Sequence, residues 1–213
     1  MTDFTLYHFP GACSQVTLCA LEAAGLPYAL KLVNLAKGEQ GTPEYLAVSP
    51  LGKVPALVVD GDVLTENAAL LVYIAALAPA AGLFLANPSP RMLCDAQAGL
   101  SFCGGTLHPQ IRGIANPQRL TTGDGAPVRE MATKLAGKSF AFAEQRLAER
   151  GWWLGEWSII DVYINWAFTV ARGGGFDSAA YPLLSGLAAR LAERPAFARM
   201  QEIEAESKAA LGL

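Results

Sequence analysis

The predicted β-strands of this 213-residue chain all lie in its first 65 residues, and the patterns beyond residue 90 are helical. Apolar and β-branched runs bounded by Pro, Gly or Asp predict strands, here at Phe4–His8, Tyr28–Leu35, Ala56–Val59 and Asp62–Leu64. Apolar residues at helical spacing predict helices among them, at Ser14–Ala24, Pro43–Val48 and Glu66–Leu77. A strand-rich third followed by an all-helical remainder predicts two packed units.

The first helix follows directly on the first strand. Pro10-Gly11 ends that strand, because both residues favour turns. Apolar residues then recur at i, i+3, i+4 and i+7 from Val16, and Gly25 suits the left-handed residue that ends a helix. The resulting strand–helix–strand unit is expected to have a right-handed crossover.

The composition changes after about Gly82. The segment Leu85–Arg91, LANPSPR, carries two prolines and suits a linker. We therefore expect an α/β domain over residues 1–82, a linker over 83–90 and an all-helical domain over 91–213. Helices are predicted in the last domain at Arg91–Ile114, Pro127–Arg150, Ser158–Arg172, Tyr181–Glu193 and Pro195–Ala210.

Charge and hydropathy argue against two classes of partner. The net charge is −3 and no basic cluster occurs, so nucleic acid is not an expected partner. The stretch Ala68–Ala86 is uncharged and nearly long enough to span a bilayer, but Pro79 and Gly82 interrupt it. No membrane association is expected.

The four cysteines favour a reducing compartment. No C-x-x-C motif and no His pair at zinc-ligand spacing is present, and no signal peptide is evident. We therefore expect a cytoplasmic protein with free thiols and no metal. Cys19, Cys94 and Cys103 are expected to be small buried residues.

One helix start in the second domain is well signalled. Ser158 and Asp161 fit a capping box, and Trp157 and Val162 occupy the positions of a hydrophobic staple. We interpret this as a folding signal rather than as a catalytic aspartate.

Cys13 lies at the predicted mouth of the first helix. Unpaired amides and the positive end of the helix dipole stabilise a thiolate there. Such a thiolate can attack a disulfide; alternatively, the same amides can hold the thiolate of a ligand. Ser14 could help by donating its hydroxyl.

Two further segments suggest a site for a peptide. Pro55 precedes a predicted strand, and a cis Val54–Pro55 bond would leave the backbone of Val54 open to an extended peptide. Thr65-Glu66-Asn67 opens a helix whose amides can take a carboxylate, while Glu66 could accept an α-ammonium group. Together with Cys13, these features fit a small peptide that carries a thiol.

The motifs LYHFPGACS, GKVPALVVDGDVLTEN, LHP and LGEWSIIDVY resemble those of the cytosolic glutathione transferases, most closely the bacterial beta class. The resemblance runs over essentially the whole chain. It implies a thioredoxin-like N-terminal domain, an all-helical C-terminal domain and a homodimer. It also implies glutathione as co-substrate and a small hydrophobic electrophile as second substrate, as in detoxification.

The resemblance assigns roles to particular residues. Cys13 and His108 are implied to be catalytic. The implied glutathione contacts, with Ser14 added for its hydroxyl, are Ser14, Lys37, Lys53, Val54, Pro55, Glu66 and Asn67. The second-substrate pocket is expected to include Phe9, Ile111 and Trp166 beside His108.

The chain departs from the family pattern at three positions. Asn67 stands where serine is common, and Pro109 stands where a lysine can follow the histidine. His8 replaces the tyrosine of several classes, and we interpret it as a structural residue at a strand end. Tyr7 should point to the opposite face, so no tyrosine mechanism is expected.

The sequence leaves the reaction open. Conjugation to an electrophile and thiol–disulfide exchange both fit. So do a non-catalytic binding or scaffold protein and a specialised glutathione-dependent isomerase, dehalogenase or ether-cleaving lyase, because a fold alone does not assign function.

Overall fold

The computed structural model of this chain describes residues 3–213, which divide into two units. The first unit comprises the segment up to Leu83 together with Ala192–Leu213, and the second comprises Phe84–Leu191. The C-terminal helix therefore groups with the N-terminal unit, whereas the sequence placed residues 91–213 in one helical domain.

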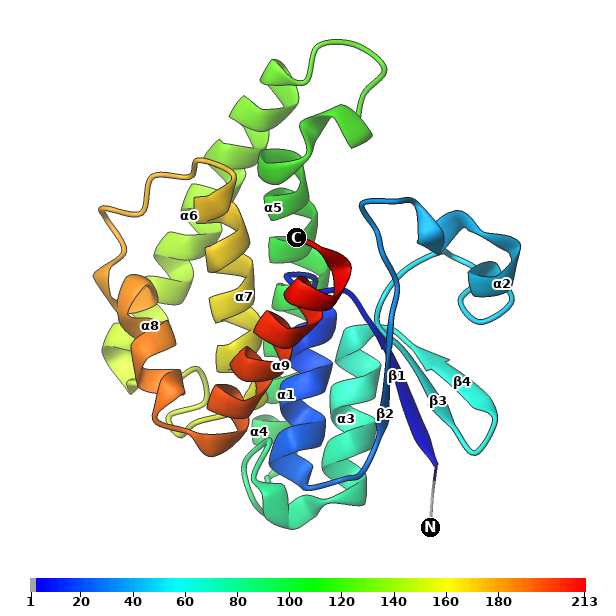
Figure 1. Cartoon of the computed structure of the whole chain (residues 1–213). Coiled ribbons are helices and arrows are strands. Elements are labelled where there is room, and N and C mark those ends of the chain that lie inside the picture. The colour runs from blue at the N-terminus through cyan, green and yellow to red at the C-terminus, as the bar shows by residue number, and fades with distance from the viewer. Residues whose placement is uncertain (1–2) are drawn as a thin grey trace. The chain divides into compact units, whose positions relative to one another are not determined.

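A four-stranded mixed sheet forms the centre of the first unit, in the order β2-β1-β3-β4 (Figure 1). The strands are β1 (Phe4–His8), β2 (Ala29–Leu32), β3 (Ala56–Val59) and β4 (Asp62–Thr65). β1 pairs in parallel with β2 and antiparallel with β3, which pairs antiparallel with β4. The thioredoxin-like sheet expected from the sequence is confirmed.

Alternation along β1 decides which side chains face the helices. Phe4, Leu6 and His8 are buried, whereas Tyr7 is only partly buried and packs against Tyr45 with ring centroids 5.6 Å apart. Because neighbouring side chains of a strand point to opposite faces, His8 joins the core and Tyr7 does not. His8 is the last residue of β1, which agrees with its interpretation as a structural residue at a strand end.

The helices of the first unit begin and end close to the predicted positions. They are α1 (Ser14–Ala24), α2 (Pro43–Leu46), α3 (Asn67–Leu77) and α9 (Pro195–Leu211), with the short turns η1 (Glu39–Gly41) and η2 (Pro79–Ala81). Helix α1 packs against both α3 and α9 (Figure 1). It ends at Gly25, whose φ of 61° is the left-handed conformation that glycine adopts readily.

The second unit is helical. Its elements are α4 (Pro90–Ser101), η3 (Phe102–Leu107), α5 (His108–Ala115), η4 (Pro117–Arg119), α6 (Ala126–Arg150), α7 (Ile159–Gly173) and α8 (Pro182–Ala192). The single helix predicted over Arg91–Ile114 is wrong in one respect, because η3 is a π-helical segment between α4 and α5. Such segments often occur at functional sites.

The capping box of α7 is present as predicted. The carboxylate of Asp161 accepts the backbone N–H groups of Trp153 and Ser158 over 2.8 and 2.9 Å, and the Ser158 hydroxyl over 3.0 Å. Asp161 is fully buried, and burial raises its pKa to about 6 although these hydrogen bonds oppose the shift. Its contacts are those of a helix cap, as the sequence indicated.

The surroundings of the cysteines agree with the sequence for two of three residues. Cys19 and Cys103 are fully buried, and burial raises the pKa of both thiols, that of Cys19 to about 12. The expectation for Cys94 is wrong, because its position on α4 is exposed. None of the four cysteines, all of which lie within residues 3–213, forms a disulfide.

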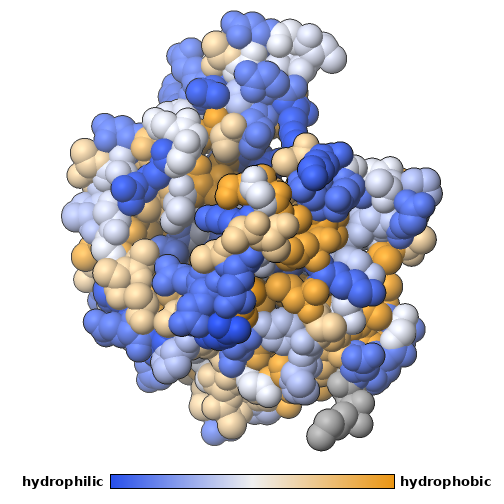
Figure 2. All heavy atoms as spheres, viewed as in Figure 1, coloured by the Kyte–Doolittle hydropathy of each residue, from blue (hydrophilic) through white to orange (hydrophobic). Residues whose placement is uncertain are grey.

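The segment that resembled a membrane span is divided between α3 and η2. No helix within residues 3–213 has the length and apolar character needed to cross a membrane. On the face drawn in Figure 2, hydrophilic side chains are interspersed with hydrophobic ones.

Candidate active site

Cys13 directly precedes α1 and forms its N-cap, at the start of the helix where the sequence placed it. The Ala12 N–H donates to the Phe9 carbonyl over 3.0 Å, and Gly11 has a φ of 81°. With Pro10 preceding Gly11, this is the geometry of a type II turn. Because Cys13 is the N-cap of α1, the turn places its thiol at the amino end of the helix.

The thiol of Cys13 lies against the segment predicted to bind a peptide. Its Sγ donates to the backbone carbonyl of Val54 over 3.5 Å, and the Cys13 residue is 7% exposed. The Val54–Pro55 peptide bond is cis, as the sequence suggested. A thiol therefore sits beside the carbonyl that an extended ligand would use.

The segment before Val54 is held by hydrogen bonds to one carbonyl. The hydroxyls of Tyr45 and Ser49 donate to the Lys53 carbonyl over 2.7 and 2.9 Å. Burial raises the pKa of Tyr45 to about 12, so its hydroxyl remains a donor at neutral pH. The Lys53 backbone is thereby fixed, while its side chain is exposed.

An apolar cluster supports this part of the site. Val33, Tyr45 and Val54 are its buried members, and Phe9 packs against them. Phe9 was expected in a second-substrate pocket; the structure packs it against this cluster, and the role in a pocket stays a prediction.

Ser14 is fully buried, and its hydroxyl is engaged within the protein. Its Oγ lies 2.8 Å from Nδ1 of His8 and donates to the carbonyl of Phe9 over 3.4 Å. These contacts tie the first turn of α1 to the end of β1. A contact between Ser14 and a bound sulfur stays a prediction.

Glu66 and Asn67 open α3 in different ways. Glu66 has an exposed side chain and a φ of 69°, which is uncommon for a residue with a side chain and often marks a functional position. The Asn67 side chain is turned inward: its Nδ2 donates to the Cys13 carbonyl over 3.0 Å, and its Oδ1 accepts the Thr17 hydroxyl. Lys37, predicted to contact a carboxylate, is exposed in the loop before η1.

The remaining predicted residues lie in the second unit. His108 begins α5 directly after η3. Its ring meets that of Trp166 edge to face with centroids 4.7 Å apart, and Ile111 is buried on the same helix. His108 and Trp166 therefore contact each other within the second unit. The functions predicted for these residues stay predictions.

Sequence reasoning missed two residues that contact the candidate site. Thr17 lies one helical turn after Cys13, and this i, i+4 spacing could have identified it. The second is Glu204, whose carboxylate accepts the Gly11 N–H over 2.7 Å. Those residues are 193 positions apart, so no local pattern could have indicated the contact.

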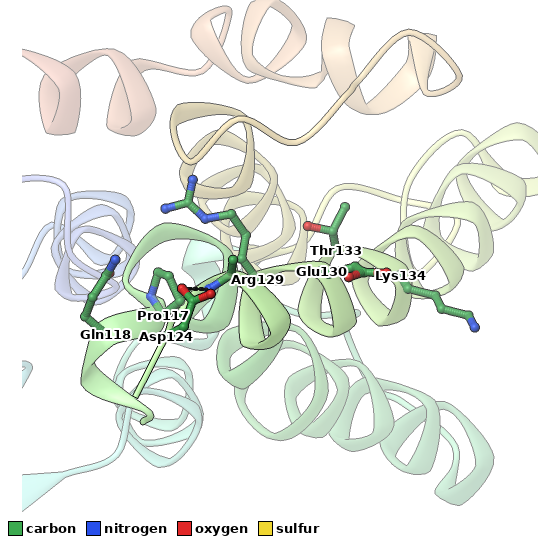
Figure 3. A pocket seen from close by; sticks show the side chains of 9 residues that line it. Pro117, Gln118, Asp124, Arg129, Glu130, Thr133 and Lys134 are labelled. Carbon is green, nitrogen blue, oxygen red and sulfur yellow. Dashed lines mark hydrogen bonds between the residues drawn. The ribbon is translucent and has the colours of Figure 1, made fainter. Parts of the chain in front are cut away.

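A cavity of about 590 Å³ lies elsewhere, at the start of α6 (Figure 3). It is lined by Pro117, Gln118, Asp124, Gly125, Ala126, Arg129, Glu130, Thr133 and Lys134. None of the predicted site residues is among them, and its side chains carry both signs of charge. Within residues 3–213, no group of three or more His, Cys, Asp or Glu side chains could hold a metal ion.

Comparison with known sequences adds independent information. Residues 2–76 match the family model described as "Glutathione S-transferase, N-terminal domain". The glutathione S-transferase GST-4.5 of Xanthomonas campestris is 32% identical over 188 residues, which cover 86% of this chain and 87% of that protein. The maleylacetoacetate isomerase of Pseudomonas aeruginosa is 32% identical over 183 residues, covering 84% and 85%.

Solved structures agree in fold over nearly the whole chain. A glutathione transferase homologue from Sulfitobacter with bound glutathione has a TM-score of 0.86 at 30% identity, covering 95% of this chain and 98% of that one. The bacterial beta-class glutathione S-transferase of Sphingomonas chungbukensis has a TM-score of 0.82 at 30% identity, covering 94% and 98%.

Proposed function

The chain belongs to the glutathione S-transferase family, and from that premise we propose that it binds glutathione along Val54 and activates the peptide's thiol at the mouth of α1. One observation carries the proposal: the Cys13 Sγ lies 3.5 Å from the Val54 carbonyl. An extended peptide that pairs with Val54 through its backbone would therefore bring a cysteinyl sulfur close to Cys13 and the amides of α1.

The rest of the proposed glutathione site uses the exposed charges of the first unit. Glu66 accepts the α-ammonium group of the γ-glutamyl end, and the amides at the start of α3 take its carboxylate. Lys37 and Lys53 remain candidates for the carboxylates of the peptide. Pro55 shapes the edge on which the peptide lies.

The activated thiol has two proposed uses. In conjugation, the thiolate forms a carbon–sulfur bond with a small hydrophobic electrophile, whose leaving group departs with the bonding electron pair. In exchange, the thiolate attacks a disulfide and expels the other sulfur as a thiolate. His108 is proposed as a proton acceptor, and Ile111 and Trp166 as part of the second-substrate pocket.

A second candidate function is isomerisation. The resemblance to the maleylacetoacetate isomerase of P. aeruginosa is as high in identity as that to the X. campestris transferase, at 32% each. In an isomerase, glutathione would add to an unsaturated acid and leave again, so it would not be consumed. Consumption of glutathione during turnover therefore separates the two functions.

We also propose a homodimer in a cytoplasmic, reducing compartment. Met131, Leu135 and Phe142 on α6 are 56%, 42% and 50% exposed, and their spacing places them on one face of the helix. A second copy of this chain is the proposed occupant of that face. Light scattering of the wild type and of a Leu135→Lys variant tests the dimer, which should dissociate in the variant. The four cysteines, all within residues 3–213, form no disulfide, and this supports the proposed compartment.

Calorimetric titration with glutathione tests the main proposal. The wild type, Cys13→Ala and the control Cys94→Ala should all bind, while only Cys13→Ala should fail to form a mixed disulfide with oxidised glutathione. Absence of binding to the wild type would contradict the proposal.

A further inference from the structure

Glu204 on α9 reaches the turn that precedes Cys13. Its Oε2 accepts the backbone N–H of Gly11 over 2.7 Å. Its Oε1 lies 3.0 Å from Nε2 of His8, at the distance of an ion pair but without the alignment of a hydrogen bond. One carboxylate therefore contacts both the end of β1 and the turn that follows it.

The contacts continue from His8 to the residue after Cys13. The second ring nitrogen of His8, Nδ1, lies 2.8 Å from Oγ of Ser14. His8 and Ser14 are fully buried, and Glu204 is 8% exposed. Cys13 is thus flanked by two residues that Glu204 restrains, Gly11 directly and Ser14 through His8.

We propose that Glu204 is a positioning residue that clamps the turn at Gly11 and the first turn of α1, and thereby fixes the Cys13 thiol beside Val54. The role in thiol placement follows from the contacts within the first unit alone. The effect of this clamp on glutathione binding rests on the proposed function.

The position of Glu204 suits a clamp. Helix α9 packs along α1 (Figure 1), and Phe197, Met200 and Ile203 are buried on it. A side chain on a packed helix is held more precisely than one on a loop. Its hydrogen bond to Gly11 involves a carboxylate, and such charge-assisted bonds are about twice as strong as neutral ones.

A hydrolytic role for these residues does not fit. Serine, histidine and a carboxylate form the triads of many hydrolases. Here, however, Ser14 is fully buried and its hydroxyl donates to the Phe9 carbonyl. Both contacts of this oxygen lie within the protein, so the arrangement serves position rather than nucleophilic attack.

Residue-resolved alkylation of the native protein tests the clamp. Glu204→Ala and Glu204→Gln are compared with Glu202→Ala and Glu202→Gln, because Glu202 lies on the same helix but is exposed and pairs with Arg199. Iodoacetamide labelling at each cysteine is followed by mass spectrometry. Cys13 should react about tenfold faster in Glu204→Ala than in the wild type, a factor that corresponds to about 1.4 kcal/mol of local opening. In Glu204→Gln the rate should rise only about threefold, because the glutamine side chain can still accept the Gly11 N–H.

The other cysteines separate a local effect from a general one. Cys19 and Cys103 are fully buried, so their labelling reports wider unfolding, while exposed Cys94 reports reagent activity. Faster labelling of Cys13 alone supports the clamp. An unchanged rate at Cys13, or an equal rise at Cys19 and Cys103, would overturn it. If Glu204→Ala does not fold, Glu204→Gln carries the same test.

Calorimetry with glutathione distinguishes this inference from the proposed function. Binding to the wild type should weaken about tenfold in Glu204→Ala and remain unchanged in Glu202→Ala. If the wild type binds no glutathione, the proposed function fails, while the labelling of Cys13 still decides the role of Glu204. If the wild type binds and Glu204→Ala binds equally well, the clamp does not act on the glutathione site.

Discussion

The side-chain amide of Asn67 donates to the backbone carbonyl of Cys13 over 3.0 Å. The Oδ1 of the same side chain accepts the Thr17 hydroxyl. The first turn of α3 is therefore joined to the first turn of α1. Because Glu66 directly precedes Asn67, these hydrogen bonds also restrain the distance between the Glu66 backbone and Cys13.

Asn67→Ala should destabilise the protein. The substitution leaves the Cys13 carbonyl without this amide donor and the Thr17 hydroxyl without its acceptor. Burying unsatisfied polar groups costs about 1–3 kcal/mol, so the free energy of unfolding in urea should fall by that amount. Combination with Thr17→Val provides the control: the cost of Asn67→Ala should be smaller in the Thr17→Val background, and equal costs would contradict the coupling.

Asp161 should make stability depend on pH between about 4 and 6. Its pKa is 3.8 in a model peptide and about 6 in the folded protein, mainly because of burial. In that window the folded protein holds a proton that the unfolded chain has released. The free energy of unfolding therefore falls as pH rises, by up to about 3 kcal/mol from this group.

Urea unfolding of the wild type and Asp161→Asn at several pH values checks this dependence. The difference between the two profiles should change across pH 4 to 6 and remain flat above it, since the asparagine does not titrate. A constant difference across this range would contradict a raised pKa for Asp161.

Local signals explain why much of the first unit could be predicted from sequence. Pro10-Gly11 ends β1, and Asp60-Gly61 forms the turn between β3 and β4, where φ is 49° at Asp60 and 95° at Gly61. These residues determine backbone conformation wherever they occur. The start of α7 was predictable for the same reason, since a capping box needs only residues that lie close together in sequence.

Features that depend on distant residues could not be predicted. The contact of Glu204 with Gly11 depends on α9 packing along α1. The inward turn of Asn67 depends on the carbonyl of Cys13, which lies 54 residues away. Cys94 was expected to be buried from its residue type, but its exposure depends on which face of α4 meets solvent.

The four thiols should react in a defined order. Cys94 is exposed, Cys13 is 7% exposed, and Cys19 and Cys103 are fully buried. Burial also raises the pKa of Cys19 and Cys103, which removes the reactive thiolate. Titration of the native protein with a chromogenic disulfide should therefore label Cys94 first and Cys13 next.

Denaturant provides the control for this order, because unfolding should expose all four thiols to the reagent. Cys94→Ser should remove the fastest phase and leave the other phases unchanged. Rapid labelling of Cys103 in the native protein would contradict its burial.

The Glu144 carboxylate on α6 should contribute to the stability of α8. Its two oxygens accept the backbone N–H groups of Leu183 and Leu184 over 2.7 and 2.9 Å, which are donors at the start of α8. Glu144→Ala removes both acceptors and a negative charge near the positive end of the helix dipole. The free energy of unfolding in urea should fall by about 1–2 kcal/mol. Glu149→Ala is the matched control on the same helix, since Glu149 is exposed and accepts a hydrogen bond from the Gln145 side chain. It should change stability by less than about 0.5 kcal/mol. Equal effects of the two substitutions would show that Glu144 does not cap α8.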